Sequence, residues 1–208
     1  MIQPLLMSQD LSFERNNKFI FHSFNFTLNH GEALHVLGEN GCGKSTLLRM
    51  LAGLIEPQQG RILWQNEPIH LLSYQQQLHY IGHHNGIKPA LTVLENIKLY
   101  CALLAKKPSS SQLSDYLQIL NLHSVIHSPA AHLSAGQLRR LALIKLFLKP
   151  ATLWILDEPT TALDISGQEL LTRLLNQHLA CGNCAIIATH HDIQHLGNKQ
   201  TINLGVSA

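Results

Sequence analysis

The residues best suited to chemistry are a run of nine with the sequence Gly-Glu-Asn-Gly-Cys-Gly-Lys-Ser-Thr. This run matches the phosphate-binding loop pattern G-x-x-x-x-G-K-[ST]. Glycines allow a tight backbone turn close to a polyphosphate, and the N–H groups at a helix N-terminus attract anions. Lys44 would reach the β- and γ-phosphate oxygens, and the Ser45 hydroxyl would bind Mg²⁺. The run therefore predicts a nucleotide site formed by Gly38, Glu39, Asn40, Gly41, Cys42, Gly43, Lys44, Ser45 and Thr46.

A carboxylate pair, Asp157 and Glu158, follows the unbroken apolar run Leu153–Leu156. Such a run is typical of a parallel strand covered on both faces, and sheets of this kind bind ligands at the carboxyl ends of their strands. Phosphoryl transfer to water needs a metal, a cradle for charge and a group that orients the water. We expect Asp157 to hold Mg²⁺ through water beside Ser45, and Glu158 to polarise the attacking water. His190, at the end of a neighbouring strand, could contact the γ-phosphate.

The elements that position these residues are predicted from hydrophobic spacing. Short alternating or apolar runs between residues 5 and 37 predict strands separated by polar turns. Residues 47–52 predict a helix that Gly53 ends. The first part of the chain is therefore expected to be mostly antiparallel β structure around one βα unit.

The middle of the chain has a different pattern. Residues 92–120 carry apolar stripes at helical spacing, with Thr92 as a candidate N-cap. Ser134 is a second candidate N-cap, and the helix behind it is expected to run as far as Pro150. Residues 90–130 are predicted to form a helical lobe inserted into the α/β core.

Composition limits the possible partners. The chain has 208 residues, a formal net charge of +2 and only 13% charged residues. Weak basicity without a Lys/Arg cluster argues against a nucleic acid partner. Residues 1–10 lack the pattern of a signal peptide, and the most apolar run, residues 138–148, is too short to span a bilayer. We expect a cytosolic protein, or one bound to a membrane through another molecule.

The cysteine pair Cys181 and Cys184 has C-x-x-C spacing, which is compatible with redox chemistry or half a zinc site. However, the pair precedes a predicted strand and the sequence holds no second pair. An ordinary structural role is favoured.

Taken together, the motifs resemble those of the ATP-binding cassette (ABC) ATPases. Gly38–Ser45 resembles the Walker A motif and Leu153–Glu158 resembles Walker B. Leu133–Gln137 is similar to the L-S-G-G-Q signature, Thr161–Asp164 to the D-loop, and Thr189–His190 to the switch histidine. The resemblance covers essentially the whole chain with the motifs in order.

The resemblance implies an ATP hydrolase with an α/β fold: a P-loop NTPase core with an antiparallel β subdomain and an inserted helical subdomain. Residues 1–208 would form one ABC ATPase domain, with a core of about 1–82 and 150–208 and a helical lobe of about 84–149. Two chains would face each other head to tail, each binding ATP and Mg²⁺ between its Walker A motif and the partner's signature. The contacts made to the partner's ATP would come from Ser134, Ala135, Gly136, Gln137 and Asp164.

Three residues depart from the family pattern. Ala135 replaces the first glycine of the signature, a small change that still permits close approach. Arg15 occupies the position of the aromatic residue that stacks on adenine, with Phe13 as an alternative; a guanidinium can also stack on a base. His84 replaces the glutamine of the loop that enters the helical lobe, so that His84 is a third candidate catalytic residue beside Glu158 and His190.

A narrower resemblance, carried by residues 80–96 and 151–159, is to the ATP-binding subunits of bacterial cytochrome c maturation. It implies a peripheral protein at the cytoplasmic face of the inner membrane, with an integral-membrane partner of the haem exporter B type. Hydrolysis would drive haem export or release haem onto a chaperone. Two alternatives remain open: an exporter with another cargo, and a soluble mechanical or regulatory ABC ATPase.

Overall fold

The computed structural model describes residues 3–204; Met1 and Ile2, which the signal-peptide expectation included, lie outside the described residues. The chain divides into two compact units. The core unit contains residues 1–83, 151–159 and 172–208, and the helical unit contains residues 84–150 and 160–171. The expected core also contained residues 160–171, whereas their contacts group them with the helical unit.

The first sheet of the core unit is antiparallel, with strand order β2-β1-β4-β5. Asn16 and Asn17 have positive φ angles of 53° and 56°, the backbone twist that suits a two-residue hairpin turn. The pairing of β1 with β2 is irregular around Asp10, which also has a positive φ. The strands are β1 (Leu6–Arg15), β2 (Lys18–Leu28), β4 (Gln59–Trp64) and β5 (Glu67–Pro68).

The second sheet of the core unit is parallel, with strand order β6-β7-β8-β3-β9. Every residue of β7 and β8 is buried, as expected for central strands covered on both faces. The carboxyl ends of β7, β8 and β3 lie together in register, because Leu37 pairs with Thr189 and Asp157 pairs with Ala188. The strands are β6 (Leu78–Ile81), β7 (Leu153–Asp157), β8 (Cys184–Thr189), β3 (Ala33–Leu37) and β9 (Lys199–Asn203).

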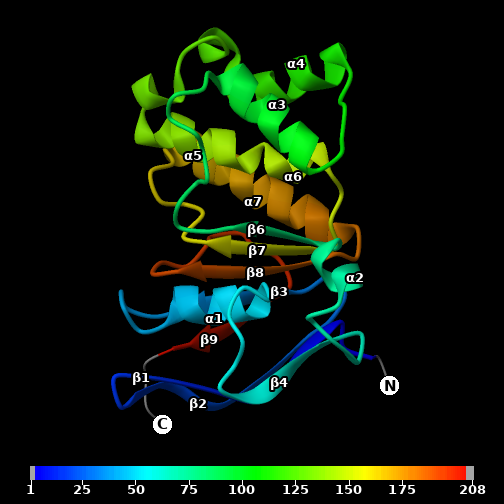
Figure 1. Cartoon of the computed structure of the whole chain (residues 1–208), viewed down its shortest axis with the longest axis vertical. Helices are drawn as coiled ribbons and strands as arrows, with labels where there is room; N and C mark the ends of the chain where they lie inside the picture. The colour runs from blue at the N-terminus through cyan, green and yellow to red at the C-terminus, as the bar shows by residue number, and fades with distance from the viewer. Residues whose placement is uncertain (1–2, 205–208) are drawn as a thin grey trace. The chain divides into compact units, whose positions relative to one another are not determined.

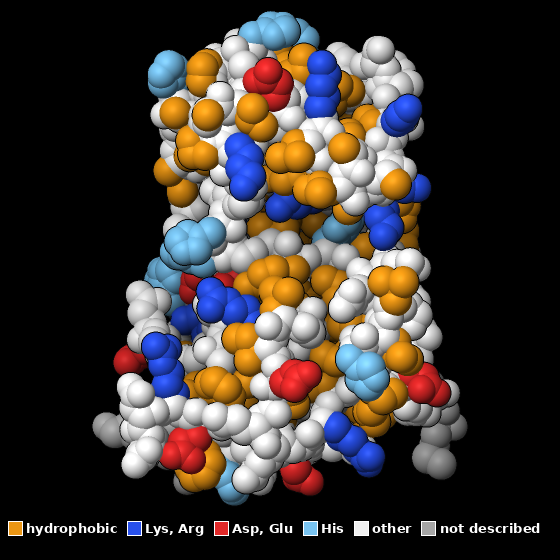
Figure 2. Space-filling view, in the orientation of Figure 1, with side chains coloured by type: hydrophobic (Ala, Val, Ile, Leu, Met, Phe, Trp, Pro, Cys, Tyr) orange, Lys and Arg blue, Asp and Glu red, His pale blue; other side chains and the backbone are white. Residues whose placement is uncertain are grey.

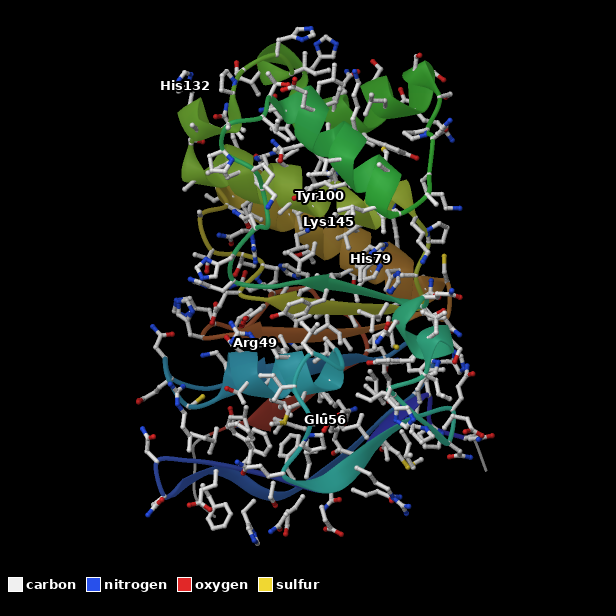
Figure 3. All side chains as sticks on the ribbon, viewed as in Figure 1. Arg49, Glu56, His79, Tyr100, His132 and Lys145 are labelled. Carbon is white, nitrogen blue, oxygen red and sulfur yellow. The ribbon has the colours of Figure 1, made fainter. Side chains whose placement is uncertain are left out.

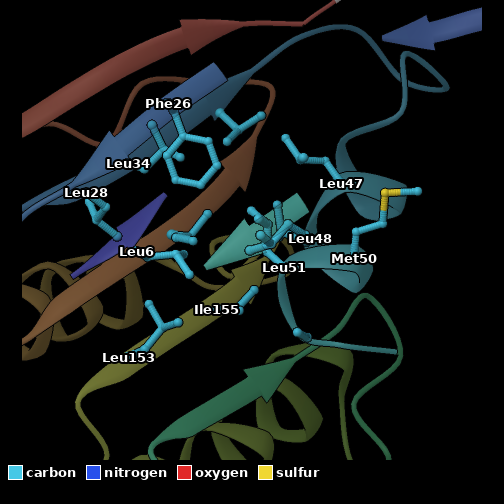
Figure 4. Close-up of a cluster of buried hydrophobic side chains, with 14 of the residues drawn as sticks. Leu6, Phe26, Leu28, Leu34, Leu47, Leu48, Met50, Leu51, Leu153 and Ile155 are labelled. Carbon is cyan, nitrogen blue, oxygen red and sulfur yellow. The ribbon is translucent and has the colours of Figure 1, made fainter. Parts of the chain in front are cut away.

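Helix α1 (Lys44–Leu51) lies between the two sheets (Figure 1). Its side chains join those of both sheets in one buried cluster, where Leu48 and Leu51 lie among residues such as Leu6 and Ile155 (Figure 4). On the other side of the parallel sheet, His178 of α7 (Ile165–Ala180) stacks on Trp154 with ring centroids 3.8 Å apart. A short helix, α2 (Leu72–Gln75), precedes β6.

The helical unit consists of helices that begin at capped residues. Thr92, Ser109 and Ser134 each form a capping box with the side chain three residues later, which satisfies N–H groups that the helix leaves unpaired. The Thr92 and Ser134 caps are as predicted. The helices are α3 (Val93–Leu103), α4 (Ser110–Ile119), α5 (Ala135–Leu143) and α6 (Lys145–Leu148), with 3₁₀ turns at His123–Val125 and Ala130–His132.

The expected single helix from Ser134 to Pro150 is wrong, because the helix is interrupted at Ile144. The Ile144 N–H bonds to the carbonyl of Leu141, three residues back. This tighter 3₁₀ closure breaks the α-helical ladder, so that α5 and α6 are separate helices.

Candidate functional site

The phosphate loop leads from β3 into α1, and its glycines are required by the packing. Gly38 has a φ of 157°, and a Cβ there would lie 2.7 Å from the carbonyl oxygen of Leu204. Gly43 has a φ of 107°, and its missing Cβ would overlap the side chain of Ile20. Ile20 therefore lines the loop, a contact that the spacing of the sequence does not reveal.

The ammonium of Lys44 lies within the loop and is almost completely buried. It donates to the carbonyls of Gly38 and Glu39 at 2.6 Å and 3.1 Å. Its third contact is with Oε1 of Glu158 at 3.5 Å. A buried positive charge held by carbonyls of a flexible glycine loop is well placed to exchange these contacts for phosphate oxygens.

Glu158 and His190 meet at the carboxyl ends of β7 and β8. Nδ1 of His190 lies 3.0 Å from Oε2 of Glu158. The Glu158 side chain is 12% exposed and that of His190 is 45% exposed. The backbone N–H of Glu158 is fixed by the carbonyl of Ala188 at 2.8 Å. The core unit thus brings together Lys44, Glu158 and His190, three of the residues that the sequence predicted for the site.

A divalent cation would find hard oxygen donors in the same unit. Asp157 is the last residue of β7 and is completely buried, and Ser45 lies in the first turn of α1, which packs against β7. Carboxylate and hydroxyl oxygens are the donors that Mg²⁺ accepts in phosphate sites. The donor set therefore fits Mg²⁺.

Arg15 and Phe13, the two candidates for stacking on adenine, have different surroundings. Arg15 is the last residue of β1 and is exposed. Phe13 is partly buried and stacks on Phe21, with ring centroids 6.3 Å apart. Because the Phe13 ring is packed against the core cluster, Arg15 is the more accessible of the two.

The signature residues lie at the start of α5 in the helical unit. Ser134 Oγ accepts from the Gln137 N–H at 3.2 Å, and Gln137 Oε1 accepts from the Ser134 N–H at 2.9 Å. Ala135 is exposed. A Cβ on Gly136 would lie 2.8 Å from the carbonyl of Ala162. Gly136 thus lets α5 approach the D-loop of the same unit.

Asp164, predicted to contact the partner's ATP, is held within its own chain in this structure. Its carboxylate accepts from Arg140 Nη2 at 2.5 Å, from Ser166 Oγ at 3.0 Å and from the Gly167 N–H at 3.1 Å. The hydrogen bond from Arg140 lowers the pKa of the Asp164 carboxyl. Asp164 therefore ties the D-loop to α5, and both segments belong to the helical unit.

His84 is exposed at the start of the helical unit, and the next residue ties the loop to the helices. The Asn85 side chain accepts from Arg139 Nη1 at 2.9 Å, and its carbonyl lies 3.5 Å from Lys145 Nζ. The Lys145 ammonium also sits over the Tyr100 ring, 4.4 Å from its centroid (Figure 3). Desolvation lowers the pKa of Lys145. Because Tyr100 of α3 also donates to the Asn85 carbonyl at 3.4 Å, Asn85 connects the loop to three helices.

Cys181 is exposed and Cys184 is buried. Burial raises the pKa of the Cys184 thiol to about 12, which leaves little reactive thiolate.

The fold, the phosphate loop with its neighbours Glu158 and His190, and the signature residues at the start of α5 define an ATP-binding subunit. The chain belongs to the ABC transporter family, whose family model matches residues 21–161. An ABC transporter ATP-binding protein of Pyrococcus furiosus has the same fold, with a TM-score of 0.82 and 22% identity, and the match covers 96% of each chain. CbiO1 of Clostridium perfringens, part of the ABC transporter complex cbiONQ, aligns with a TM-score of 0.76 and 26% identity over 97% of this chain and 85% of that one.

Among curated proteins, the chain is similar to the cytochrome c biogenesis ATP-binding export proteins CcmA. It is 42% identical over 191 residues to that of Pasteurella multocida, covering 91% of this chain and 90% of that protein. It is 43% identical over 197 residues to that of Escherichia coli K12, covering 94% and 93%. In the part of the chain that the structure describes, no helix is both long and apolar enough to cross a membrane.

Proposed function

We propose that the chain is the ATP-hydrolysing, energy-coupling subunit of an inner-membrane ABC complex for c-type cytochrome biogenesis. The observation that carries the hydrolytic part is the cluster of Lys44, Glu158 and His190 at the end of the phosphate loop. The similarity to the CcmA proteins supports the biological part. Residues 1–208 are proposed to act as one ATPase domain made of both units.

The proposed chemistry uses the contacts of the core unit. Lys44 exchanges its loop carbonyls for β- and γ-phosphate oxygens, beside the N–H groups of residues 38–46, while Arg15 stacks on the adenine. Glu158 orients water for attack on the γ-phosphorus and accepts its proton, while the bond from the γ-phosphorus to the bridging oxygen breaks and ADP leaves. His190, held at 3.0 Å from Glu158, contacts the γ-phosphate. Mg²⁺, held by Ser45 and through water by Asp157, would neutralise phosphate charge.

We further propose that the active form is a homodimer in which Ser134, Ala135, Gly136 and Gln137 of one chain contact ATP bound by the partner. The exposed start of α5 supports this proposal, since Ser134 and Ala135 are accessible. Asp164 would then position the D-loop through Arg140.

The composite site predicts that Ser134→Arg abolishes hydrolysis without weakening ATP binding by the isolated chain. Arginine would place bulk and charge where the partner's γ-phosphate must lie. Mixing this variant with Lys44→Ala chains should restore part of the hydrolysis, because one of the two sites then has an intact loop and an intact signature. ATP binding and hydrolysis are measured for each variant and for the mixture. Loss of ATP binding by Ser134→Arg monomers would contradict the assignment to the partner's site.

His84 is proposed to take the place of the family's glutamine and to report the state of the γ-phosphate to the helical unit through Asn85. An imidazole and an amide each offer a donor and an acceptor at similar reach. His84→Gln should therefore hydrolyse ATP with the membrane partner present, whereas His84→Ala should be uncoupled from that partner. His83→Ala, a neighbouring exposed histidine, is the control. If His84→Ala hydrolyses ATP like the wild type when the membrane partner is present, His84 is an exposed surface residue without this role.

The proposed membrane partner is an integral-membrane subunit of the haem exporter B type, bound at the cytoplasmic face, and the proposed work is haem export or haem release to a chaperone. On the face drawn in Figure 2, Lys and Arg side chains are scattered among uncharged ones, a distribution that does not favour a nucleic acid. Co-purification from detergent-solubilised membranes, with haem assayed by absorbance, tests this partner. A membrane subunit without haem would favour an exporter of another cargo, and recovery of the ATPase alone would contradict the complex.

A further inference from the structure

His35 is a completely buried histidine in the middle of β3, the strand that leads into the phosphate loop. A polar side chain in such a position is costly unless its atoms have partners. Nε2 of His35 lies 2.9 Å from Oγ1 of Thr189, the last residue of β8. Nδ1 faces Oδ1 of Asp192 at 3.2 Å, a close contact that is not aligned as a hydrogen bond. His35 thus touches the chain on both sides of His190.

These contacts continue into the segment from Thr189 to Asp192. The Thr189 hydroxyl donates to the carbonyl of His191. His190, between them, directs its ring to Glu158. The position of the His190 ring therefore depends on the segment from Thr189 to Asp192, which His35 contacts at both ends.

The charged groups facing His35 come from two elements. Asp192 follows β8, and Lys199 begins β9 and donates to both carboxylate oxygens of Asp192 at 2.6 Å and 2.8 Å. Burial lowers the pKa of His35 below its usual value; Asp192 opposes this shift and Lys199 adds to it. The neutral imidazole is therefore the main form of His35 at neutral pH.

The Thr189 hydroxyl and the neutral His35 ring each carry one hydrogen, and these two hydrogens determine which atom donates in each contact. Because the single hydrogen of the Thr189 hydroxyl goes to His191, Oγ1 can only accept from His35, and Nε2 must carry the one proton of the neutral ring. Nδ1 is then a bare acceptor facing a carboxylate, consistent with its poor alignment.

We propose that His35 is a positioning residue for His190: through its hydrogen bond with Thr189 it holds the segment from Thr189 to Asp192 in place. The inference rests on the proposed function, because it concerns the group assigned to the γ-phosphate. It also predicts how strongly the backbone amides of this segment are protected from hydrogen exchange in the protein without nucleotide.

Two substitutions test the hold. His35→Leu removes both contacts with an apolar side chain of similar size. His35→Gln keeps an N–H donor for Thr189. His70→Gln, at an exposed histidine of the same unit, is the matched control. Each chain is assayed for amide hydrogen exchange of residues 189–193 without nucleotide, and for kcat and KM of ATP hydrolysis.

In His35→Leu, residues 189–193 should exchange about tenfold faster and kcat should fall by about tenfold, with KM little changed, as expected for the loss of a buried hydrogen bond. His35→Gln should retain most of the exchange protection and of kcat, because its amide still donates to Thr189. Unchanged exchange and an unchanged kcat in His35→Leu would overturn the inference. A wild-type protein without ATPase activity would instead contradict the proposed function, while the exchange comparison would still decide whether His35 holds the segment.

Discussion

Glu158→Gln should stop ATP hydrolysis while leaving ATP bound. The amide cannot accept a proton from water as the carboxylate can, and loss of such a group typically lowers the rate by about 100-fold or more. Binding should persist because Lys44 and the phosphate loop are unchanged, and the Lys44 ammonium is freed from the Glu158 charge. With hydrolysis blocked, ATP should hold two chains together, so that sedimentation with ATP shows a dimer.

The matched control is Glu56→Gln, the same substitution at an exposed position (Figure 3). It should hydrolyse ATP like the wild type and show no trapped dimer. If Glu158→Gln turns over ATP at the wild-type rate, Glu158 does not orient the attacking water and the assignment fails.

Lys44→Ala should fail at an earlier step, by weakening ATP binding. The substitution removes a buried ammonium that is already directed into the phosphate loop. Charge-assisted hydrogen bonds contribute about 1.5–3 kcal/mol, which corresponds to a loss of affinity of about 10- to 100-fold. Titration with a fluorescent ATP analogue measures the change directly.

Lys106→Ala, at an exposed lysine, serves as the control for Lys44→Ala and should bind ATP normally. Together, the variants should separate binding from hydrolysis: Lys44→Ala loses affinity, and Glu158→Gln loses turnover. Wild-type affinity in Lys44→Ala would show that the loop binds phosphate without its lysine.

The phosphate loop and the helix caps at Thr92 and Ser134 could be predicted from the sequence because their causes are local. Gly43 and Lys44 stand at fixed spacing at the start of α1, and Ser134 forms a capping box with Gln137 three residues later. The central strands β7 and β8 were also evident, since complete burial demands unbroken apolar runs.

The features that were missed depend on contacts between distant residues. Strand β9 was not predicted because it is a polar, half-exposed strand defined only by pairing with β3. The contact of Asp164 with Arg140 joins residues 24 apart in the sequence, and that of His35 with Thr189 joins residues 154 apart. Spacing within one motif cannot reveal such pairs.

The central claim is that ATP hydrolysis by this chain serves c-type cytochrome biogenesis. The most direct measurement is haem staining of membrane and periplasmic proteins from a strain that lacks the gene and carries the wild-type chain, Glu158→Gln or Glu56→Gln. The wild type and Glu56→Gln should restore covalently attached haem, and Glu158→Gln should not. Normal c-type cytochromes in the strain without any copy, or with Glu158→Gln alone, would contradict the claim.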